Sequence, residues 1–419
     1  MRPLILGGGA ATLAALAGLA VSQAPLGTPL FYVFAAVPCV VYALLLPRVL
    51  AGDADPPARL LTAALVFAVL FRIPLAVAPV GADNDMVRYL YDGRVQRFGL
   101  NPFEIVPADP ALAWTHTDET RRMPSIRART PYPAAAQLFF RLVVTIRETP
   151  RAMKVALVLC DLLTIAVLLR WLQETGRSTW LALAYAWNPL VILEVAHSGH
   201  IDALGALWIA ISAWMLGTGR GMRAAAAFVL AVATKLVPIV LVPLFWRRVR
   251  IRDAAVGAGL LLACYLPFAS AGTVALGNVP NVVAAIRFNG PIFHAIAGAA
   301  APSVAAAVAL CAGIILAGWM RAVRPANAPE GWAWPMAAAV ACAPVIYPWY
   351  LLYFTPFLFS RSTLPLVAWT YSVLPVYLVW SVQRYRRPWV VPPWVLAVEY
   401  GVLLAAIAVT VVRSRSAAA

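Results

Sequence analysis

The stretch GADNDMVRYLYDGRVQRFGLNPFE, residues 81–104, decides how the fold of this chain has to be interpreted. It sets three aspartates and three arginines within fifteen residues, directly after an apolar run. The whole chain of 419 residues is 63% hydrophobic and only 12% charged, with a mean hydropathy of +0.81. A soluble globule carries about 25% charged residues. The stretch is therefore a polar exception inside a membrane protein.

Eleven apolar runs approach the ~20 residues that cross a bilayer as a helix. They lie near residues 4–22, 28–47, 60–80, 152–169, 178–196, 201–217, 254–271, 302–320, 332–346, 363–380 and 391–412. We therefore predict an all-α polytopic membrane protein, a single transmembrane domain over residues 1–419 with about 11–13 transmembrane helices. The first run ends in VSQA, which resembles a signal-peptide cleavage site, but its length favours a retained anchor.

The formal charge of +16 first suggests a nucleic-acid partner. The basic residues instead form short clusters between apolar runs, such as RRVRIR at 247–252, as cytoplasmic loops do. We therefore predict a membrane partner, no nucleic acid, and multi-pass insertion in the cell inner (plasma) membrane. Three spans precede residue 81, so the loop that follows lies on the non-cytoplasmic face. One basic cluster, QRYRRP at 383–388, does not fit this pattern.

Residues 81–150 form the one long hydrophilic loop and hold eight of the seventeen carboxylates. A structureless loop of this length is uncommon unless it is functional or disordered. Its segments DMVRYLYDGRVQRFG, 85–99, and PAAAQLFFRLVVTI, 133–146, repeat apolar residues at helical spacing, as amphipathic interfacial helices do. We predict an outer catalytic loop with two surface-lying helices and a turn-rich centre.

The segment RAAAAFVLAVATKLVPIVLVPLFWRR, 223–248, is basic at both ends and has Lys235 near its middle. A charge at the bilayer centre costs about 2.5 to 3.5 kcal/mol even on lenient scales, so Lys235 is a functional-site hypothesis. With both ends cytoplasmic, the segment becomes a pair of short helices or a re-entrant turn with Lys235 at its tip. The alternative is a single span with a snorkelling lysine.

Two further segments carry polar or aromatic chemistry. NPLVILEVAHSGHIDALGAL, 188–207, places Glu194, His197, His200 and Asp202 at the junction of two apolar runs. They lack the spacing of a standard metal site, so we predict no metal ligands there and assign His200 and Asp202 to substrate contacts. PVIYPWYLLYFTPF, 344–357, suits a sugar or a polyprenyl chain, with an interfacial aromatic belt as the alternative. The five cysteines are dispersed singly and predict packing.

The segment NDMVRYLYDGRVQRFGLNPFEIVPADPAL, 84–112, resembles the first outer loop of bacterial polyprenyl-phosphate-sugar-dependent glycosyltransferases of the GT-C superfamily. The pattern there is close to DDxYRYLWDGRxxxxGxNPYxxxP. The resemblance continues through TPYPAAAQLFF (130–140), WNPLVILEVAHSGHIDALGAL (187–207), AVATKLVPIVLVP (231–243) and PWYLLYFTPF (348–357). It implies a GT-C-like bundle that moves a hexose, most commonly mannose, from a polyprenyl-phosphate sugar donor to a lipid or glycan acceptor.

The resemblance also implies roles for residues. Asp85 matches the second acidic position and becomes the candidate general base, with Asp83 and Asp92 as helpers. Lys235 aligns with a family lysine and would stabilise the donor phosphate. The substrate contacts we expect are Lys235, Arg88, Tyr89, Asn101, Tyr132, His200, Asp202, Trp349 and Tyr350. Asn84 stands where the pattern has its first aspartate, which leaves a divalent cation possible and no cofactor assigned.

Two alternatives accompany this assignment. Asp92 has a structural interpretation as an exposed ion pair with Arg88 or Arg94, a type of pair that adds only about 0 to 1 kcal/mol. At the level of the whole protein, a multispan lipid or sugar transporter would use Glu194, Asp202 and Lys235 as a midplane pathway. The sequence has no internal repeat of the loop or lysine motifs, and a transporter does not need the long acidic loop, so the enzyme is favoured.

Overall fold

The computed structural model describes residues 1–51, 57–79, 85–274, 276–383 and 389–416. Within these ranges the chain is helical, and its only bridge pairs Phe288 with Val345. The helices of the candidate spans are α2 (Pro29–Ala51), α3 (Ala58–Val77), α6 (Pro150–Glu174), α14 (Pro302–Val323) and α18 (Pro393–Ser416), together with α1 (Gly9–Ser22) and α11 (Ile251–Tyr265). The last two reach the length of a span only with the adjoining helical turns, as Leu4–Ser22 and Ile251–Gly272. The prediction of an all-α polytopic membrane protein is confirmed.

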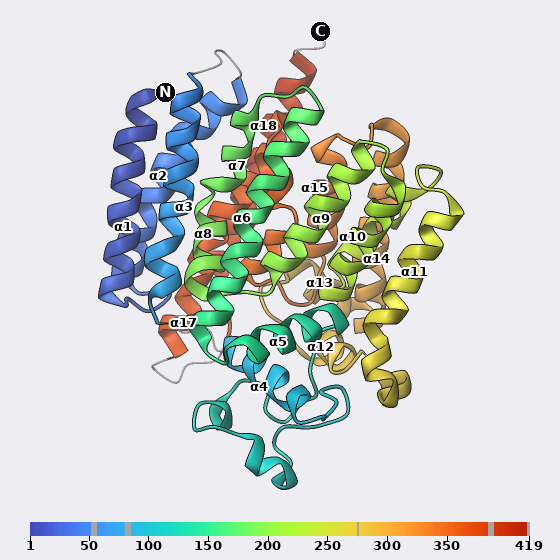
Figure 1. Ribbon diagram of the computed structural model, residues 1–419. Helices are drawn as coiled ribbons and strands as arrows, with labels where there is room; N and C mark the ends of the chain where they lie inside the picture. The colour runs from blue at the N-terminus through green and yellow to red at the C-terminus, as the bar shows by residue number, and fades with distance from the viewer. Residues whose placement is uncertain (52–56, 80–84, 275, 384–388, 417–419) are drawn as a thin grey trace.

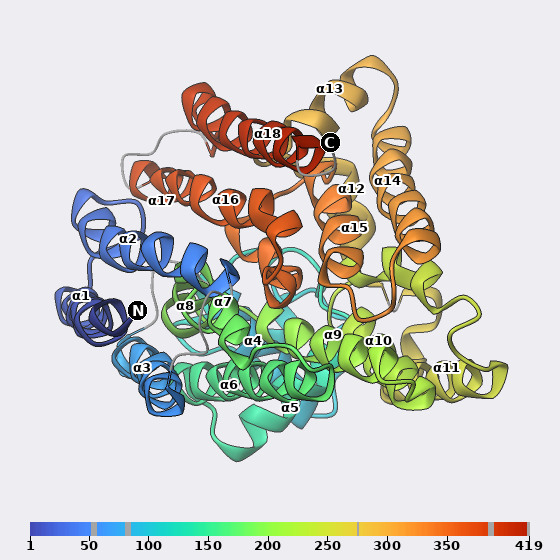
Figure 2. The same cartoon turned by 90° about the horizontal axis from the view of Figure 1, so that it is seen from above.

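Shorter helices fill the remainder of the bundle and its loops. They are α4 (Asp85–Arg97), α5 (Ala134–Ile146), α7 (Leu183–Ala186), α8 (Pro189–Ile192), α9 (Asp202–Gly217), α10 (Gly221–Thr234), α12 (Val279–Ala285), α13 (Pro291–Ala299), α15 (Pro329–Ala341), α16 (Leu364–Ser372) and α17 (Leu378–Gln383). Seen from above, α1, α2 and α3 line one side of the bundle, and α11 and α14 line the opposite side (Figure 2).

Fewer helices than apolar runs are long enough to cross a membrane. In the described ranges eight segments qualify, and a ninth counts the pair Thr179–Ala186 and Pro189–Ser198, which is bent by 55°. Two of the eleven runs fall instead on α9 and α15, which have only 16 and 13 residues. Irregular backbone precedes α9 and follows α15, so each helix is shorter than a membrane span. Hydropathy alone does not reveal these irregular segments.

The basic clusters and the acidic loop occupy opposite ends of the bundle. Helices α4 and α5 lie at one end, whereas α1 begins and α18 ends at the other (Figure 1). At that other end, Arg220 pairs with Glu174 at 3.0 Å, and Arg248 donates to the Arg324 carbonyl at 2.6 Å. The first contact joins the start of α10 to the end of α6, and the second joins the loop before α11 to the end of α14. The cluster QRYRRP reaches residues 384–388, which lie outside the described residues.

The chain turns back at Lys235. Helix α10 ends at Thr234, Lys235 has extended backbone (φ −160°, ψ 147°), and a 3-10 helix follows at Val237–Phe245. Arg223 before the turn and Arg248 after it line the same shallow depression. Because both basic ends lie together, the segment enters and leaves the bundle at one end, and Lys235 lies at the far tip of the hairpin.

Helices α4 and α5 form a packed layer beneath the bundle. Gly93 permits their close approach, since a Cβ there would lie 2.7 Å from the Phe140 carbonyl oxygen. Asp92 accepts hydrogen bonds from Thr130 (2.6 Å) and Gln137 (2.9 Å) and pairs with Arg88 at 2.7 Å. Asp92 therefore pairs with Arg88, as one prediction had it, but the pair is buried and not exposed. Tertiary packing against α5 covers it.

Candidate active site

A lysine–carboxylate pair lies at the tip of the Lys235 hairpin. Lys235 Nζ is 2.7 Å from Asp202 Oδ1 and 3.8 Å from the centroid of the Tyr350 ring. Asp202 is the first residue of α9, where the helix dipole stabilises a negative charge. The ring face of Tyr350 adds a cation–π attraction. Three segments distant in sequence thus hold one ammonium group in place.

The same carboxylate keeps unused hydrogen-bonding capacity. Among the described residues, Asp202 Oδ2 is buried and has no hydrogen-bond partner, and neither has the Tyr353 hydroxyl. The two groups belong to neighbouring turns, since a Cβ at Gly205 would lie 2.1 Å from that hydroxyl. Buried polar groups are ordinarily hydrogen-bonded, so unsatisfied ones need an explanation. A polar ligand at this point would supply the missing partners.

His200 lies between a carboxylate and an aromatic stack. Its Nδ1 is 2.7 Å from Glu194 Oε2, a contact that becomes an ion pair when the imidazole is protonated. Tyr377 donates to the other oxygen of Glu194. The His200 ring stacks on Trp349 at 3.9 Å and 12°, and Trp349 stacks on Tyr347 at 4.4 Å and 10°. The imidazole is therefore held on two sides.

Local backbone irregularity produces the position of His200. Residues Leu193–Ser198 form a π-helical turn, and Gly199 follows in the left-handed region with φ 77°. Such π turns are frequent at functional sites, because the extra residue per turn redirects side chains. A Cβ at Gly199 would lie 2.4 Å from the terminal methyl group of Met86, so the Met86 side chain would have to move. The junction between the two apolar runs is therefore a specific turn rather than a solvated connection.

The outer loop contributes a tyrosine pair that contacts this junction. The Tyr89 hydroxyl accepts a hydrogen bond from the Ile201 amide at 3.4 Å, and its ring stacks on Phe140 at 4.6 Å. Tyr132 packs edge-on against Tyr89 at 5.1 Å. Burial, and then the nearby charge of Asp85, raise the pKa of Tyr132 well above its usual value. Tyr132 thus stays protonated and remains a hydrogen-bond donor.

The candidate residues of the sequence divide into two groups. One group meets where the loop layer touches the bundle: Asp85, Tyr89, Tyr132, His200, Asp202, Lys235, Trp349 and Tyr350. Asp85, at the start of α4, and Tyr350, beneath Lys235, both raise the pKa of Tyr132, after the larger effect of burial. Asp83 lies outside the described residues.

The second group maintains the fold of the loop. Asp92 and Arg88 belong to the buried network that joins α4 to α5. Asn101 donates to Ser270 Oγ at 2.9 Å and accepts from the Phe103 amide at 3.1 Å, so it fixes the Asn-Pro turn to the end of the α11 segment. Asp92 and Asn101 thus bond within the protein, whereas Arg88 Nη2 is buried without a hydrogen-bond partner among the described residues. We therefore leave Asp92 out of the proposed catalytic residues and Asn101 out of the proposed substrate contacts, and Arg88 stays a predicted substrate contact.

Several residues of the site, or near it, had no assigned role from the sequence. Tyr377 completes the surroundings of His200 by donating to Glu194, but nothing in its local sequence distinguishes it from an aromatic belt. Tyr347, which stacks on Trp349, belongs to the segment 344–357 for which a sugar or polyprenyl contact is predicted. Lys154 is different, because a lone lysine in an apolar run is a visible signal. Its Nζ donates to the carbonyls of Leu75 at 2.5 Å and Ala78 at 3.1 Å. Within the described chain, no three His, Cys, Asp or Glu side chains are grouped as metal ligands.

Fold and site together define a polytopic membrane protein with a polar site where a folded acidic loop meets the helix ends. A family model described as alpha-(1->6)-mannopyranosyltransferase, N-terminal domain, matches residues 8–249, more than half of the chain. The chain therefore belongs to this mannopyranosyltransferase family, which is a family of glycosyltransferases. The resemblance to membrane mannosyltransferases is confirmed.

Comparison with individual proteins gives a narrower match. Alpha-(1->6)-mannopyranosyltransferase Rv1459c of Mycobacterium tuberculosis (strain ATCC 25618 / H37Rv) is 31% identical over 147 residues. The match covers 32% of this chain and 24% of that relative, so the chain spans about a quarter of the relative's length. No solved structure matches the chain.

Proposed function

We propose that this protein transfers mannose from a polyprenyl-phosphate sugar to a lipid or glycan acceptor at the non-cytoplasmic face of the plasma membrane. One observation carries the proposal: the loop that begins α4 with Asp85 packs onto the bundle end that presents Lys235 and Asp202. A candidate base and a candidate phosphate-binding cation therefore belong to one end of the protein. The family membership supplies mannose as the sugar.

The reaction needs a base and charge stabilisation. In the proposed step, the acceptor hydroxyl oxygen forms a bond to C1 of mannose while the bond from C1 to the phosphate oxygen breaks. Asp85 takes the proton of the acceptor hydroxyl, which is general-base catalysis. The leaving lipid phosphate gains negative charge, and Lys235 stabilises it electrostatically. Every proton and electron pair is then accounted for by the chain and its two substrates.

The remaining side chains suit sugar binding. Asp202 Oδ2 and the Tyr353 hydroxyl are buried and lack partners among the described residues, so a sugar hydroxyl would satisfy both. The ring faces of Trp349 and Tyr350 offer apolar contact to the sugar or to the first prenyl units. Glu194 acts as a positioning residue, because it contacts Nδ1 of His200 and thereby fixes the imidazole next to Trp349.

Membrane orientation is part of the proposal. The basic residues near Arg220 and Arg248 lie at the end opposite to α4 and α5, and cytoplasmic loops are the ones rich in Lys and Arg. The loop with Asp85 would then face outward, where a lipid-linked sugar is the available donor. Cysteines introduced singly at Thr117 and Ser125 should react with impermeant thiol reagents added outside intact cells. A cysteine at Gly219 should stay unlabelled, and the reverse pattern would exclude this orientation.

The direct test supplies purified full-length protein in nanodiscs with polyprenyl-phosphate mannose, polyprenyl-phosphate glucose or a nucleotide-activated mannose. We expect consumption of the polyprenyl-phosphate mannose in the lipid extract when acceptor is present. Consumption of the nucleotide sugar instead would overturn the donor assignment. Movement of an intact lipid across the bilayer without cleavage of its sugar–phosphate bond would instead establish that the protein is a transporter.

A further inference from the structure

A buried carboxylate lies in the last candidate membrane span. Glu399 of α18 is fully buried and belongs to the span Pro393–Arg413. The proposed reaction does not use this residue, and the family match ends at residue 249, far before it in the sequence. An ionisable side chain inside a membrane is costly, so its presence calls for a functional explanation.

Two neutral donors converge on this carboxylate. Trp369 Nε1 of α16 donates to Glu399 Oε1 at 2.7 Å, and Asn289 Nδ2 donates to Oε2 at 2.9 Å. Helices α16 and α18 lie side by side (Figure 2). A carboxylate offers an acceptor oxygen to each donor, whereas a glutamine would turn an NH2 group toward one of them. The two donors therefore explain why this position holds an ionisable group and not an amide.

Asn289 links α18 to the segment that precedes Tyr347. Its Nδ2 donates a second hydrogen bond, to the Ile346 carbonyl at 3.2 Å. The backbone of Asn289 is left-handed, with φ 56°, a conformation that asparagine adopts more readily than most residues. Tyr400, the residue after Glu399, donates to the Asn289 carbonyl at 2.8 Å. Asn289 is thus bound to α18 through its side chain and through its backbone.

Backbone contacts reinforce this link. The Phe288 amide donates to the Pro344 carbonyl at 3.0 Å, and the Ile346 amide donates to the Phe288 carbonyl at 2.9 Å. A Cβ at Gly290 would lie 2.4 Å from the Ala343 carbonyl oxygen, so the two segments touch along their backbones. A displacement of residues 288–290 therefore displaces residues 343–346 as well.

The segment held by Asn289 leads directly into the aromatic stack of the site, which consists of Tyr347, Trp349 and His200. The Ile346 carbonyl belongs to the planar peptide bond that precedes Tyr347, so a hydrogen bond to this oxygen orients the Tyr347 backbone. Tyr347 stacks on Trp349, and Trp349 stacks on His200. A series of direct contacts thus connects the carboxylate of α18 to the imidazole of the site.

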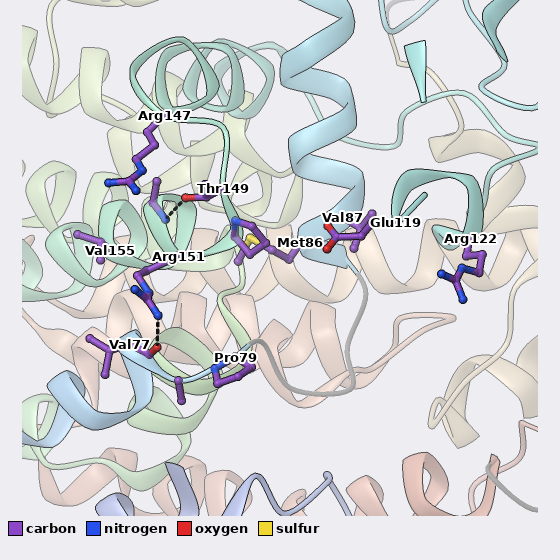
Figure 3. Close-up of a pocket in the computed structure, with 13 residues that line it drawn as sticks. Val77, Pro79, Met86, Val87, Glu119, Arg122, Arg147, Thr149, Arg151 and Val155 are labelled. Carbon is purple, nitrogen blue, oxygen red and sulfur yellow. Dashed lines mark hydrogen bonds between the residues drawn. The ribbon is translucent and has the colours of Figure 1, made fainter. Parts of the chain in front are cut away.

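This series of contacts reaches the site from within the bundle. A separate cavity of about 950 Å³ lies between the end of α3, the outer loop and the start of α6 (Figure 3). Met86, which follows the candidate base Asp85, lines that cavity, but Asn289, Ile346 and Glu399 do not. A substitution of Glu399 therefore alters the bundle side of the site and not the loop side.

We propose that Glu399 is a positioning residue of the proposed active site, and that it acts through Asn289 to hold the aromatic stack in place. The inference rests on the proposed function, in which the ring face of Trp349 contacts the donor. A stack that is fixed before the donor arrives loses less conformational freedom on binding, which strengthens the binding. The C-terminal helix thus contributes to donor binding without contacting the donor.

The first measurement requires no donor. Hydrogen exchange of the backbone amides in residues 344–353 is followed by mass spectrometry on the purified full-length protein in nanodiscs. Glu399→Gln turns an amide donor toward Asn289 or Trp369 and breaks one of the two bonds. Asn289→Gly removes the same link from the other side and suits the left-handed backbone. The control Ser372→Ala removes only the bond from Ser372 Oγ to the Glu399 backbone carbonyl, at 3.1 Å.

We expect faster exchange in residues 344–353 for Glu399→Gln and for Asn289→Gly, because both variants release the Ile346 carbonyl or its partner. Exchange in Ser372→Ala should match that of the unaltered protein. If Glu399→Gln does not fold, Asn289→Gly decides the outcome. Unchanged exchange in the first two variants, or the same increase in the control, would overturn the proposal.

The second measurement is equilibrium binding of polyprenyl-phosphate mannose. Glu399→Gln should weaken this binding roughly 3- to 10-fold, the effect of one lost hydrogen bond. In a protein that already carries Trp349→Leu, the same substitution should change binding by less than about 2-fold, because residues that act through one another are not additive. Additive effects would overturn the proposal. Absence of donor binding by the unaltered protein would contradict the proposed function, whereas the exchange measurement would still decide the role of Glu399.

Discussion

Two ion pairs within this bundle, one buried and one partly buried, differ in how completely their polar atoms are hydrogen-bonded. Arg72 of α3 and Asp161 of α6 lie inside the bundle, with Nε 2.6 Å from Oδ2. The second guanidinium nitrogen of Arg72 also reaches Asp161, at 3.4 Å, and the third donates to the carbonyls of Ala68 and Ala186, both at 2.7 Å. All three guanidinium nitrogens of Arg72 thus donate to protein acceptors. The pair joins α3 and α6 to the bent segment Thr179–Ser198 through the Ala186 carbonyl.

The Lys235–Asp202 pair is satisfied only in part. It has one contact, at 2.7 Å, while the second oxygen of Asp202 lacks a partner among the described residues. The Lys235 side chain is 18% exposed, compared with 1% for Arg72. A buried pair stabilises a protein only when additional hydrogen bonds satisfy its remaining atoms. The difference indicates that one pair holds the fold and that the other keeps capacity for a ligand.

The largest effect should follow from breaking the satisfied pair. Asp161→Ala leaves the Arg72 charge buried without its counter-ion, which costs about 3 to 5 kcal/mol of stability. We expect a much lower thermal unfolding midpoint in detergent. The matched control replaces both partners, as Arg72→Met with Asp161→Leu, and should regain most of the loss. An unchanged midpoint in Asp161→Ala would show that this pair is not structural.

The second prediction extends the comparison to two aspartates of one helix. Asp85→Asn should lower mannose transfer by at least roughly 100-fold, the scale of a lost general base, with an unchanged unfolding midpoint. Asp92→Asn should instead lower the midpoint, because it disturbs the buried network with Arg88, Thr130 and Gln137. Rates and midpoints are measured on the same nanodisc samples. Near-normal mannose transfer by Asp85→Asn would exclude Asp85 as the general base.

The third prediction concerns the unsatisfied pair itself. Lys235→Ala should weaken donor binding by roughly 10- to 100-fold, the range for a hydrogen bond to a charged group. The unfolding midpoint should fall less than in Asp161→Ala, because water reaches the partly exposed site. Lys235→Arg should restore binding only in part, since a planar guanidinium differs in geometry from an ammonium. Normal donor binding by Lys235→Ala would exclude Lys235 as the residue that binds the donor phosphate.

The smallest effect should come from the aromatic ring beneath Lys235. Tyr350→Leu keeps an apolar side chain but removes a cation–π attraction worth about 0.5 to 2 kcal/mol. Donor binding should therefore weaken a few-fold, whereas Tyr350→Phe should behave almost like the unaltered protein. Equilibrium binding of polyprenyl-phosphate mannose distinguishes the variants. Equal losses in Tyr350→Phe and Tyr350→Leu would mean that the hydroxyl, which both variants lack, and not the ring face, contacts the ligand.

The sequence by itself determined the class of protein. Apolar runs, sparse charges and one acidic loop indicate an all-α membrane protein, because burial of a helix in lipid depends on composition over ~20 residues. The loop motifs correctly identified the mannosyltransferase family. Isolated charges in apolar runs marked Lys235 as a candidate, since an intramembrane charge is costly wherever it lies. These properties depend only on the local sequence, so they can be identified before the fold is known.

Only the tertiary structure decided which polar residues are enclosed in buried hydrogen-bond networks. Asp85 and Asp92 look alike in the sequence, but packing of α5 against α4 encloses Asp92 in a hydrogen-bond network. The number of long helices also fell below the prediction, because α9 and α15 end where irregular backbone begins. Tyr377 reaches Glu194 across 183 residues of sequence. Whether a charge is satisfied depends on partners that are distant in the chain, and only folding brings those partners together.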